Sequence, residues 1–155
     1  MPADLEKLAY DSAVRALDKQ ERLVEELRAR AGVVLAASSL AVSFLGGRGF
    51  GGPGSVVLAV LALLSFVVSV SAAVVVLLPW HDFRFSPSGS DFMENLTEFR
   101  DDPGELFRRA ADVLDRLWER NDPVAYRLGR WLSIAITALG IEVVVLAALL
   151  GGNII

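Results

Sequence analysis

Apolar positions gather into three long stretches that strongly polar stretches separate. They cover residues 31–47, 55–78 and 131–150, and only Gly140 and Glu142 interrupt the third. A helix needs about 20 apolar residues to cross the hydrocarbon core of a bilayer. The first stretch, with 17 uncharged residues, rises about 25 Å as a helix and is at the lower limit for spanning. The pattern predicts an all-α integral membrane protein with three transmembrane helices.

The polar stretches also have helical periodicity. Residues 3–30 carry a recurring set of apolar or small side chains: Leu5, Ala9, Ala13, Ala16 or Leu17, Leu23 or Val24, and Leu27. Neither glycine nor proline interrupts residues 3–31, so this helix is expected to run directly into the first span. Residues 104–121 repeat the pattern at Leu106, Ala110, Val113, Leu114 and Leu117, with Asp102 or Pro103 at the start.

Because these two helices are similar in length, we expect them to pack side by side and in parallel as a stalk. Each has a narrow apolar stripe, and pairing within one chain leaves part of a stripe for a second chain, so a homo-oligomer is expected. Pro123 either kinks the second helix or ends it, in which case Asp122 caps a new one. Between spans and stalk, residues 83–87 are expected to be extended, and Phe92, Leu96 and Phe99 to share one face of a short helix.

The distribution of charged residues supports this division of the chain and predicts which parts lie on the cytoplasmic side of the membrane. Of 34 charged residues, 13 lie in residues 1–30 and 19 in residues 81–130, while residues 31–80 hold only Arg48. Because lysine and arginine favour the cytoplasmic side, the N-terminus is expected inside and the C-terminus outside. The predicted parts are a cytoplasmic helix (1–30), a transmembrane hairpin (31–79), a cytoplasmic elbow and helix (80–130), and a third span with a short external tail (131–155). Trp80, Trp131, Arg127 and Arg130 are expected to anchor the spans at the membrane interface.

Composition excludes several classes of function. There is no cysteine, which rules out a disulfide scaffold and a cysteine nucleophile. The net charge of −4 does not favour a nucleic-acid partner. His81 is the only histidine, and the acids near residue 100 do not have the spacing of a calcium loop, so neither a metal site nor an enzyme is expected.

Glu142 is the sharpest candidate site. A charged carboxylate inside a span is costly, so this residue is expected to be protonated, to face the protein interior, or to line water. In an oligomer a ring of Glu142 side chains is typical of a cation pathway or a proton relay. The alternative is a structural role, in which a protonated Glu142 bonds a neighbouring helix through the span serines.

Arginines of the 80–130 region are candidate ligands for an anion, since a guanidinium binds phosphate well. These candidates are Arg84, Arg100, Arg108, Arg109 and Arg116. The alternative is a set of helix-surface ion pairs, because Glu105–Arg109 and Asp112–Arg116 have the i,i+4 spacing.

Three features together resemble the SLATT and Pycsar-type transmembrane effectors of bacteria. The charged segment Glu26-Leu27-Arg28-Ala29-Arg30-Ala31-Gly32 enters a span rich in serine and alanine, a Phe-rich elbow, Phe83-Arg84-Phe85-Ser86-Pro87, follows the second span, and Gly140-Ile141-Glu142-Val143 lies in the last span. The resemblance covers most of the chain and is one of architecture.

The resemblance implies a multi-pass protein of the bacterial inner membrane that acts as the effector of an anti-phage system. A partner cyclase would make a cyclic nucleotide on infection, and the effector would then compromise the membrane by forming a pore. The sequence has no recognisable cyclase or soluble nucleotide-binding domain, so it implies no resident cofactor, only a possible nucleotide ligand. Two other hypotheses remain from the residues alone: a scaffold whose stalk recruits a partner, and a small oligomeric ion channel.

Overall fold

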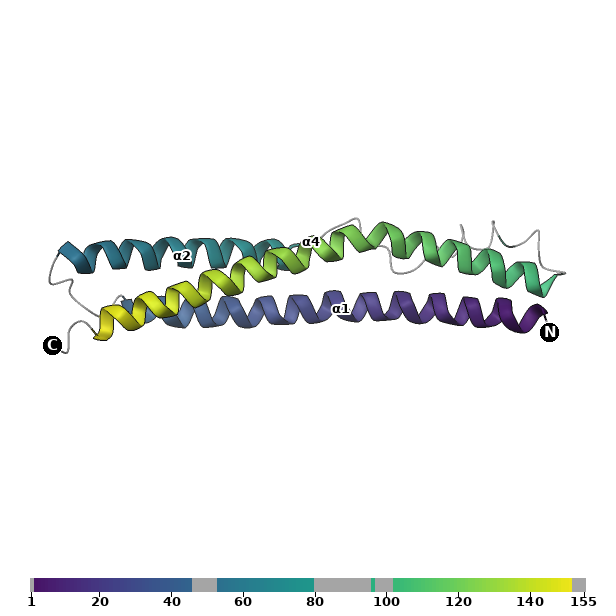
Figure 1. Ribbon diagram of the computed structural model, residues 1–155, viewed down its shortest axis with the longest axis horizontal. Coiled ribbons are helices and arrows are strands. Elements are labelled where there is room, and N and C mark those ends of the chain that lie inside the picture. The colour runs from purple at the N-terminus through teal and green to yellow at the C-terminus, as the bar shows by residue number, and fades with distance from the viewer. Residues whose placement is uncertain (1, 46–52, 80–95, 97–101, 152–155) are drawn as a thin grey trace. The chain divides into compact units, whose positions relative to one another are not determined.

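The structure, a computed structural model, describes residues 2–45, 53–79, 96 and 102–151, and nearly all of these residues are helical. Over these residues the chain forms α1 (Pro2–Leu45), α2 (Pro53–Leu77) and α4 (Pro103–Gly151), and no strand (Figure 1). The predicted all-α class is confirmed for this part of the chain. With 44 residues, α1 is about 66 Å long, and the 25 residues of α2 extend about 38 Å.

Two helices in the described ranges are long and apolar enough to cross a membrane. One is Val56–Leu77, with a hydropathy of 2.8, and the other is Pro103–Leu149, whose most apolar stretch reaches 2.4. The predicted spans 55–78 and 131–150 lie on these two helices. The first predicted span, residues 31–47, begins on α1 and continues past its end at Leu45 into residues outside the described ranges. A third span therefore stays a prediction.

The start of α4 follows the local sequence closely. The Oδ1 atom of Asp102 accepts hydrogen bonds from the backbone N–H groups of Gly104 (3.0 Å) and Glu105 (3.2 Å). Asp102 thus caps two donors that the first turn of a helix leaves unpaired, and Pro103 occupies the first helical position, where no N–H is needed. The predicted start at these residues is confirmed.

Pro123 does not end the helix. Of the two alternatives, a kink or a new helix capped by Asp122, the second is excluded, because α4 is continuous from Pro103 to Gly151. A proline removes one hydrogen bond, here the one to the carbonyl of residue 119, and leaves the bonds on either side in place. Asn121 and Ala125, which flank it, are both buried, so tertiary packing holds the helix together across the missing bond.

The chain divides into two compact units. Unit 1 consists of Met1–Glu25 and Trp80–Tyr126, and unit 2 of Glu26–Pro79 and Arg127–Ile155. Both α1 and α4 contribute residues to each unit, while α2 belongs to unit 2 alone.

Unit 1 is built on a parallel pair of helices, as the sequence predicts. Tyr10 of α1 lies against Phe107 of α4, with ring centroids 5.7 Å apart. Further along both helices, Gln20 donates a hydrogen bond from Nε2 to the backbone carbonyl of Trp118 (3.3 Å). The core between these contacts consists of Ala13, Leu17, Ala111 and Leu114, with Tyr10, Val14 and Leu117 packed against it.

The buried positions of each long helix repeat every seven residues. On α4 they include Leu114, Asn121, Leu128, Ala135 and Glu142, and on α1 they include Leu17, Val24, Ala31 and Ser38. A seven-residue repeat is typical of helices that pack side by side as in a coiled coil. The predicted stripe on α1 is wrong at its beginning, because Leu5 and Ala9 are exposed. Leu5 lies off the seven-residue register that Ala13 and Leu17 set.

Unit 2 joins three helices through small side chains. Its core consists of Ala31 and Val34 from α1, Ala72, Ala73 and Val76 from α2, and Leu132 and Ala135 from α4. Ala31, Ala73 and Ala135 are completely buried. Small residues let helix backbones approach closely, which is the usual way that helices associate in membranes.

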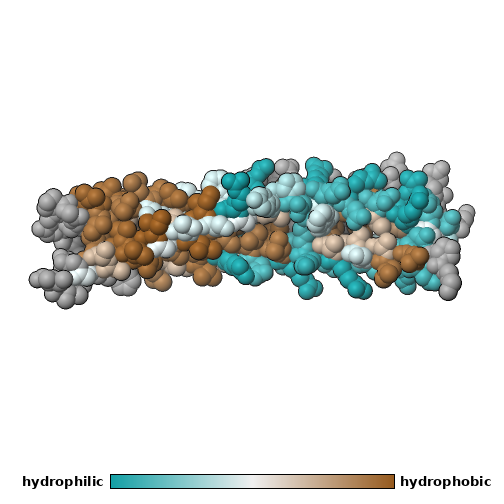
Figure 2. Space-filling model, in the orientation of Figure 1, coloured by the Kyte–Doolittle hydropathy of each residue, from teal (hydrophilic) through white to brown (hydrophobic). Residues whose placement is uncertain are grey.

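The surface of unit 2 is the reverse of a soluble domain's surface. Its large aliphatic side chains point outward, including Val57 (68% exposed), Leu64 (59%) and Val144 (69%). Its completely buried side chains include three polar ones: Ser38, Ser69 and Glu142. Figure 2 shows unit 2 almost uniformly brown and unit 1 mostly teal. Apolar surface on this scale marks a site of contact with lipid or with another protein.

We expect the small size of Ala73 to be essential for the packing of unit 2. Ala73→Leu adds volume to a filled interface and should cost about 1–3 kcal/mol of unfolding free energy. Val74→Leu is the matched control, because Val74 is exposed and its substitution should change the stability little. Unfolding of both variants in detergent, followed by circular dichroism, tests this. Equal stability of the two variants would contradict the observed packing.

Candidate functional site

The buried carboxyl of Glu142 is the central feature of unit 2. The residue lies on α4, seven positions after Ala135, and its side chain is 0% exposed. Neither Oε1 nor Oε2 has a hydrogen-bonding partner at acceptable geometry. A buried polar group without a partner is costly, which makes this carboxyl the strongest candidate for a functional group in unit 2.

Two serines near this carboxyl form hydrogen bonds that join all three helices. The hydroxyl oxygens of Ser38 on α1 and Ser69 on α2 are 3.0 Å apart, and Ser69 donates to the backbone carbonyl of Ala135 on α4, also at 3.0 Å. Ser38 also lies near the Glu142 carboxyl, but no hydrogen bond of acceptable geometry joins the two side chains. The sequence analysis expected the span serines to be possible partners of Glu142, and the structure joins two of them, Ser38 and Ser69, in one cluster.

The number of hydroxyl hydrogens available determines which group donates and which accepts in this cluster. Each serine hydroxyl carries one hydrogen, and that of Ser69 goes to Ala135, since a carbonyl only accepts. In the Ser38–Ser69 pair, Ser38 is therefore the donor. The Ser38 oxygen therefore has only lone pairs left for Glu142, so it can accept a hydrogen bond from that residue but cannot donate one.

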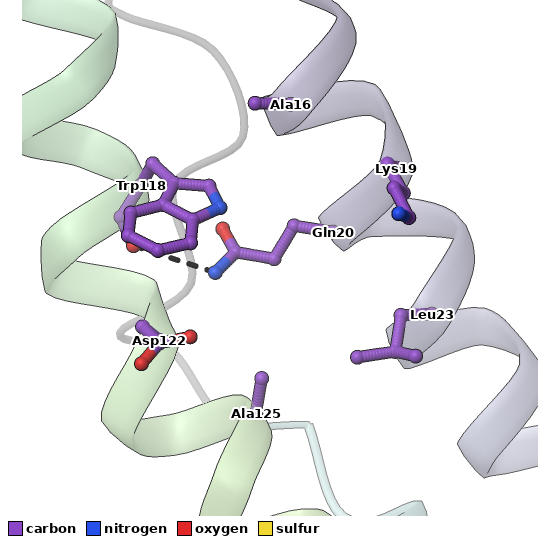
Figure 3. Close-up of a pocket in the computed structure, with 7 residues that line it drawn as sticks. All are labelled: Ala16, Lys19, Gln20, Leu23, Trp118, Asp122 and Ala125. Atoms are coloured by element: carbon purple, nitrogen blue, oxygen red, sulfur yellow. Dashed lines mark hydrogen bonds between the residues drawn. The ribbon is translucent and has the colours of Figure 1, made fainter. Parts of the chain in front are cut away.

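A groove in unit 1 is the second candidate site, and the sequence analysis missed it. It has a volume of about 350 Å³ and is lined by Ala16, Lys19, Gln20, Leu23, Trp118, Asp122 and Ala125. In Figure 3 the Gln20 side chain extends from α1 towards the Trp118 backbone, with Lys19 and Leu23 on its own helix and Asp122 and Ala125 on α4. The small side chains of Ala16 and Ala125 beside a tryptophan were the available signal.

This groove combines an aromatic surface with both signs of charge. Trp118 is 40% exposed, while Lys19 and Asp122 are exposed on opposite helices. Stacking on an indole ring and a nearby ammonium group suit a planar ligand that carries a negative charge. A volume of 350 Å³ is at the lower end of the range of small-molecule pockets, which begins at about 300 Å³.

Three of the five candidate anion-binding arginines lie in the described residues, and each has a partner on its own helix. Arg108 and Arg109 both bind Glu105, at 3.1 Å and 3.0 Å, so the alternative of helix-surface ion pairs describes them. Arg116 donates to the backbone carbonyl of Asp112 (3.2 Å), not to its carboxylate as the spacing suggested. Arg84 and Arg100 lie outside the described residues.

The other predicted site residues are on the surface or outside the described ranges. Arg127, Arg130 and Trp131 are exposed at the beginning of the α4 segment of unit 2, where the apolar stretch starts. Trp80 is not among the described residues. No group of three or more metal-ligating side chains occurs in the ranges that the structure covers.

Comparisons with known proteins give no relative. Neither the protein-family models, nor the curated proteins, nor the solved structures contain a match to this chain. The likeness to SLATT and Pycsar-type effectors therefore stays a prediction from the sequence.

Ser69 should stabilise unit 2 through its two hydrogen bonds. Hydrogen bonds between membrane helices contribute about 0.6 kcal/mol each on average, so Ser69→Ala should cost about 1 kcal/mol. Ser71→Ala is the control, since Ser71 lies on the same helix but is exposed. Unfolding in mixed micelles measures both values. A loss as large for Ser71→Ala as for Ser69→Ala would exclude a specific role for the Ser38–Ser69–Ala135 cluster.

Proposed function

We propose that this chain is a multi-pass protein of the bacterial inner membrane, with unit 2 embedded in the bilayer and unit 1 in the cytoplasm. The surface of unit 2 carries this proposal, because many large aliphatic side chains face outward, while the interior holds alanine and serine together with Val34, Val76 and Leu132. Three spans, at residues 31–47, 55–78 and 131–150, place the N-terminus inside and the C-terminus outside, in keeping with the arginine and lysine distribution.

In this proposal the protein is an effector that makes the membrane leaky when a cytoplasmic signal arrives. Two features of the structure support it. Both α1 and α4 extend without a break from unit 1 into unit 2, so a change in their pairing in unit 1 can bias the packing of the same helices in unit 2. Unit 2 also holds a carboxyl whose partners are incomplete, as expected of a group that lines or gates a pathway.

The proposed signal is a cyclic nucleotide from a partner cyclase, as the resemblance implies. The groove of unit 1 suits such a ligand better than the arginines do, since Arg108 and Arg109 are already paired. There the base stacks on Trp118 and Lys19 binds the phosphate. Binding would add a ligand between α1 and α4 and so shift how these two helices pair.

The topology is testable because the chain has no cysteine. A cysteine in place of Ser12, exposed on α1 of unit 1, should react with a membrane-impermeant maleimide only when the cytoplasmic face is accessible. A cysteine in place of Leu64, exposed on α2 of unit 2, should stay unlabelled until detergent is added. Labelling of intact and inverted membrane vesicles distinguishes these outcomes. Prompt labelling at position 64 in both preparations would contradict a transmembrane α2.

The effector function is testable with purified protein in liposomes. We expect dye release and ion flux to rise when one member of a panel of cyclic mono- and dinucleotides is added. Trp118→Ala and Lys19→Gln should each weaken this response, because they remove the stacking surface and the cation. Lys7→Gln is the charge-matched control outside the groove. Leakage without any nucleotide would favour a constitutive channel instead.

A scaffold is the second candidate function, and the paired arginines favour it. With Arg108 and Arg109 bound to Glu105, part of the cytoplasmic charge is already neutralised, as on an ordinary helix surface. The groove would then receive a side chain of a cytoplasmic partner protein. Vesicles that stay tight under every condition, together with harmless overexpression in cells, would favour the scaffold.

A further inference from the structure

We propose that Glu142 is a proton-binding site, and that the neutral acid donates a hydrogen bond to Ser38. This bond completes a chain of hydrogen bonds in which each group donates to the next, from Glu142 to Ser38, from Ser38 to Ser69, and from Ser69 to the carbonyl of Ala135. This inference rests on the membrane setting proposed for unit 2.

The first argument comes from the hydrogens of the serine cluster. Ser69 uses its hydrogen on Ala135, and Ser38 uses its hydrogen on Ser69. The Ser38 oxygen therefore presents only a lone pair to Glu142, and a carboxylate oxygen also presents only lone pairs. Two acceptors do not bond unless a hydrogen or a cation lies between them. A protonated carboxyl supplies that hydrogen without any other change in the cluster.

The second argument comes from burial. Glu142 is completely buried, and both of its oxygens are inaccessible as well as unpartnered. An ionised carboxylate in this position would face apolar helices with no donor to stabilise it, which is costly in a bilayer. Complete burial also leaves little space beside the carboxyl for a hydrated cation, whereas a proton needs none.

The third argument comes from the charges around the site. On α1 the last charged residue is Arg30, eight residues before Ser38, and no titratable side chain occurs in residues 31–45. Residues 53–77, which form α2, have none either. On the α4 segment of unit 2 the other charges are Arg127 and Arg130, at least 12 residues away, which is about 18 Å along the helix. No cation in these segments is near enough to hold Glu142 in its ionised form.

A bound proton would make the packing of unit 2 depend on protonation. With the proton in place, Glu142 joins α4 to Ser38 of α1, and Ser69 joins α2 to both neighbours. When the proton leaves, Ser38 loses its donor and the charged carboxylate favours a more hydrated environment. The three helices then separate enough to admit water, which is the change that a membrane-permeabilising state requires.

Infrared spectroscopy of the full chain in lipid bilayers tests the protonation directly. The carbonyl stretching band of a protonated carboxyl is separate from the bands of carboxylates, so the loss of such a band in a variant assigns it to the substituted residue. We expect one such band at pH 7 in the wild type and its loss in Glu142→Gln. Glutamine is also a neutral donor, so this variant should keep the wild-type helical content.

Two further variants test the hydrogen bond. Ser38→Ala removes the acceptor, so the band should move to the higher frequency of a carboxyl without a hydrogen-bonding partner. Ser43→Ala is the control, since the exposed Ser43 hydroxyl donates to the carbonyl of Ser39 on its own helix. It should leave the band unchanged.

Three outcomes would overturn the proposal. Absence of the band in the wild type at pH 7 would mean that Glu142 is ionised. Loss of the band when sodium or lithium is added would assign the site to a small cation. A band that is the same in Ser38→Ala and the wild type would exclude Ser38 as the acceptor. None of these results depends on leakage, so the proton site and the effector function can fail independently.

Discussion

Three helices of unit 2 meet along a seam of alanine and serine, and the rest of that unit depends on how closely their backbones approach there. Ser69 reaches the carbonyl of Ala135 at 3.0 Å, and this contact requires neighbours as small as Ala73 and Ala135. The same close approach closes the interior around Glu142. Where lipid surrounds a protein, packing and interhelical hydrogen bonds hold helices together, because expulsion of water contributes little.

The two units use the same helices with different chemistry. In unit 1 the seven-residue register buries leucine and alanine and leaves charged side chains on the outside, as in a soluble coiled coil. In unit 2 the register buries Ser38, Ala135 and Glu142, and the large aliphatic residues are outside. The change from one arrangement to the other is the strongest physical support for the proposed bilayer setting of unit 2.

Polar residues at core positions give each unit its specificity. Gln20 bonds the Trp118 backbone in unit 1, and Ser38 bonds Ser69 in unit 2. A polar side chain at such a position costs stability but selects the register in which it finds a partner. Glu142 differs from the other two because neither of its side-chain oxygens has a hydrogen-bonding partner, and for this reason it is the best candidate for a functional group.

The sequence by itself determined the helical class, the start of α4 at Pro103 and the parallel pairing of α1 with α4 in unit 1. Periodicity, capping residues and the absence of breakers are local properties, so they can be read from the chain. The sequence also singled out Glu142, because one acid in an apolar stretch is conspicuous. Tertiary structure alone decided that α4 continues through Pro123, since packing of Asn121 and Ala125 offsets the lost backbone bond. It also decided that Ser38 and Ser69 form the cluster at Ala135. These contacts join residues far apart in the chain, and spacing along one helix does not specify them.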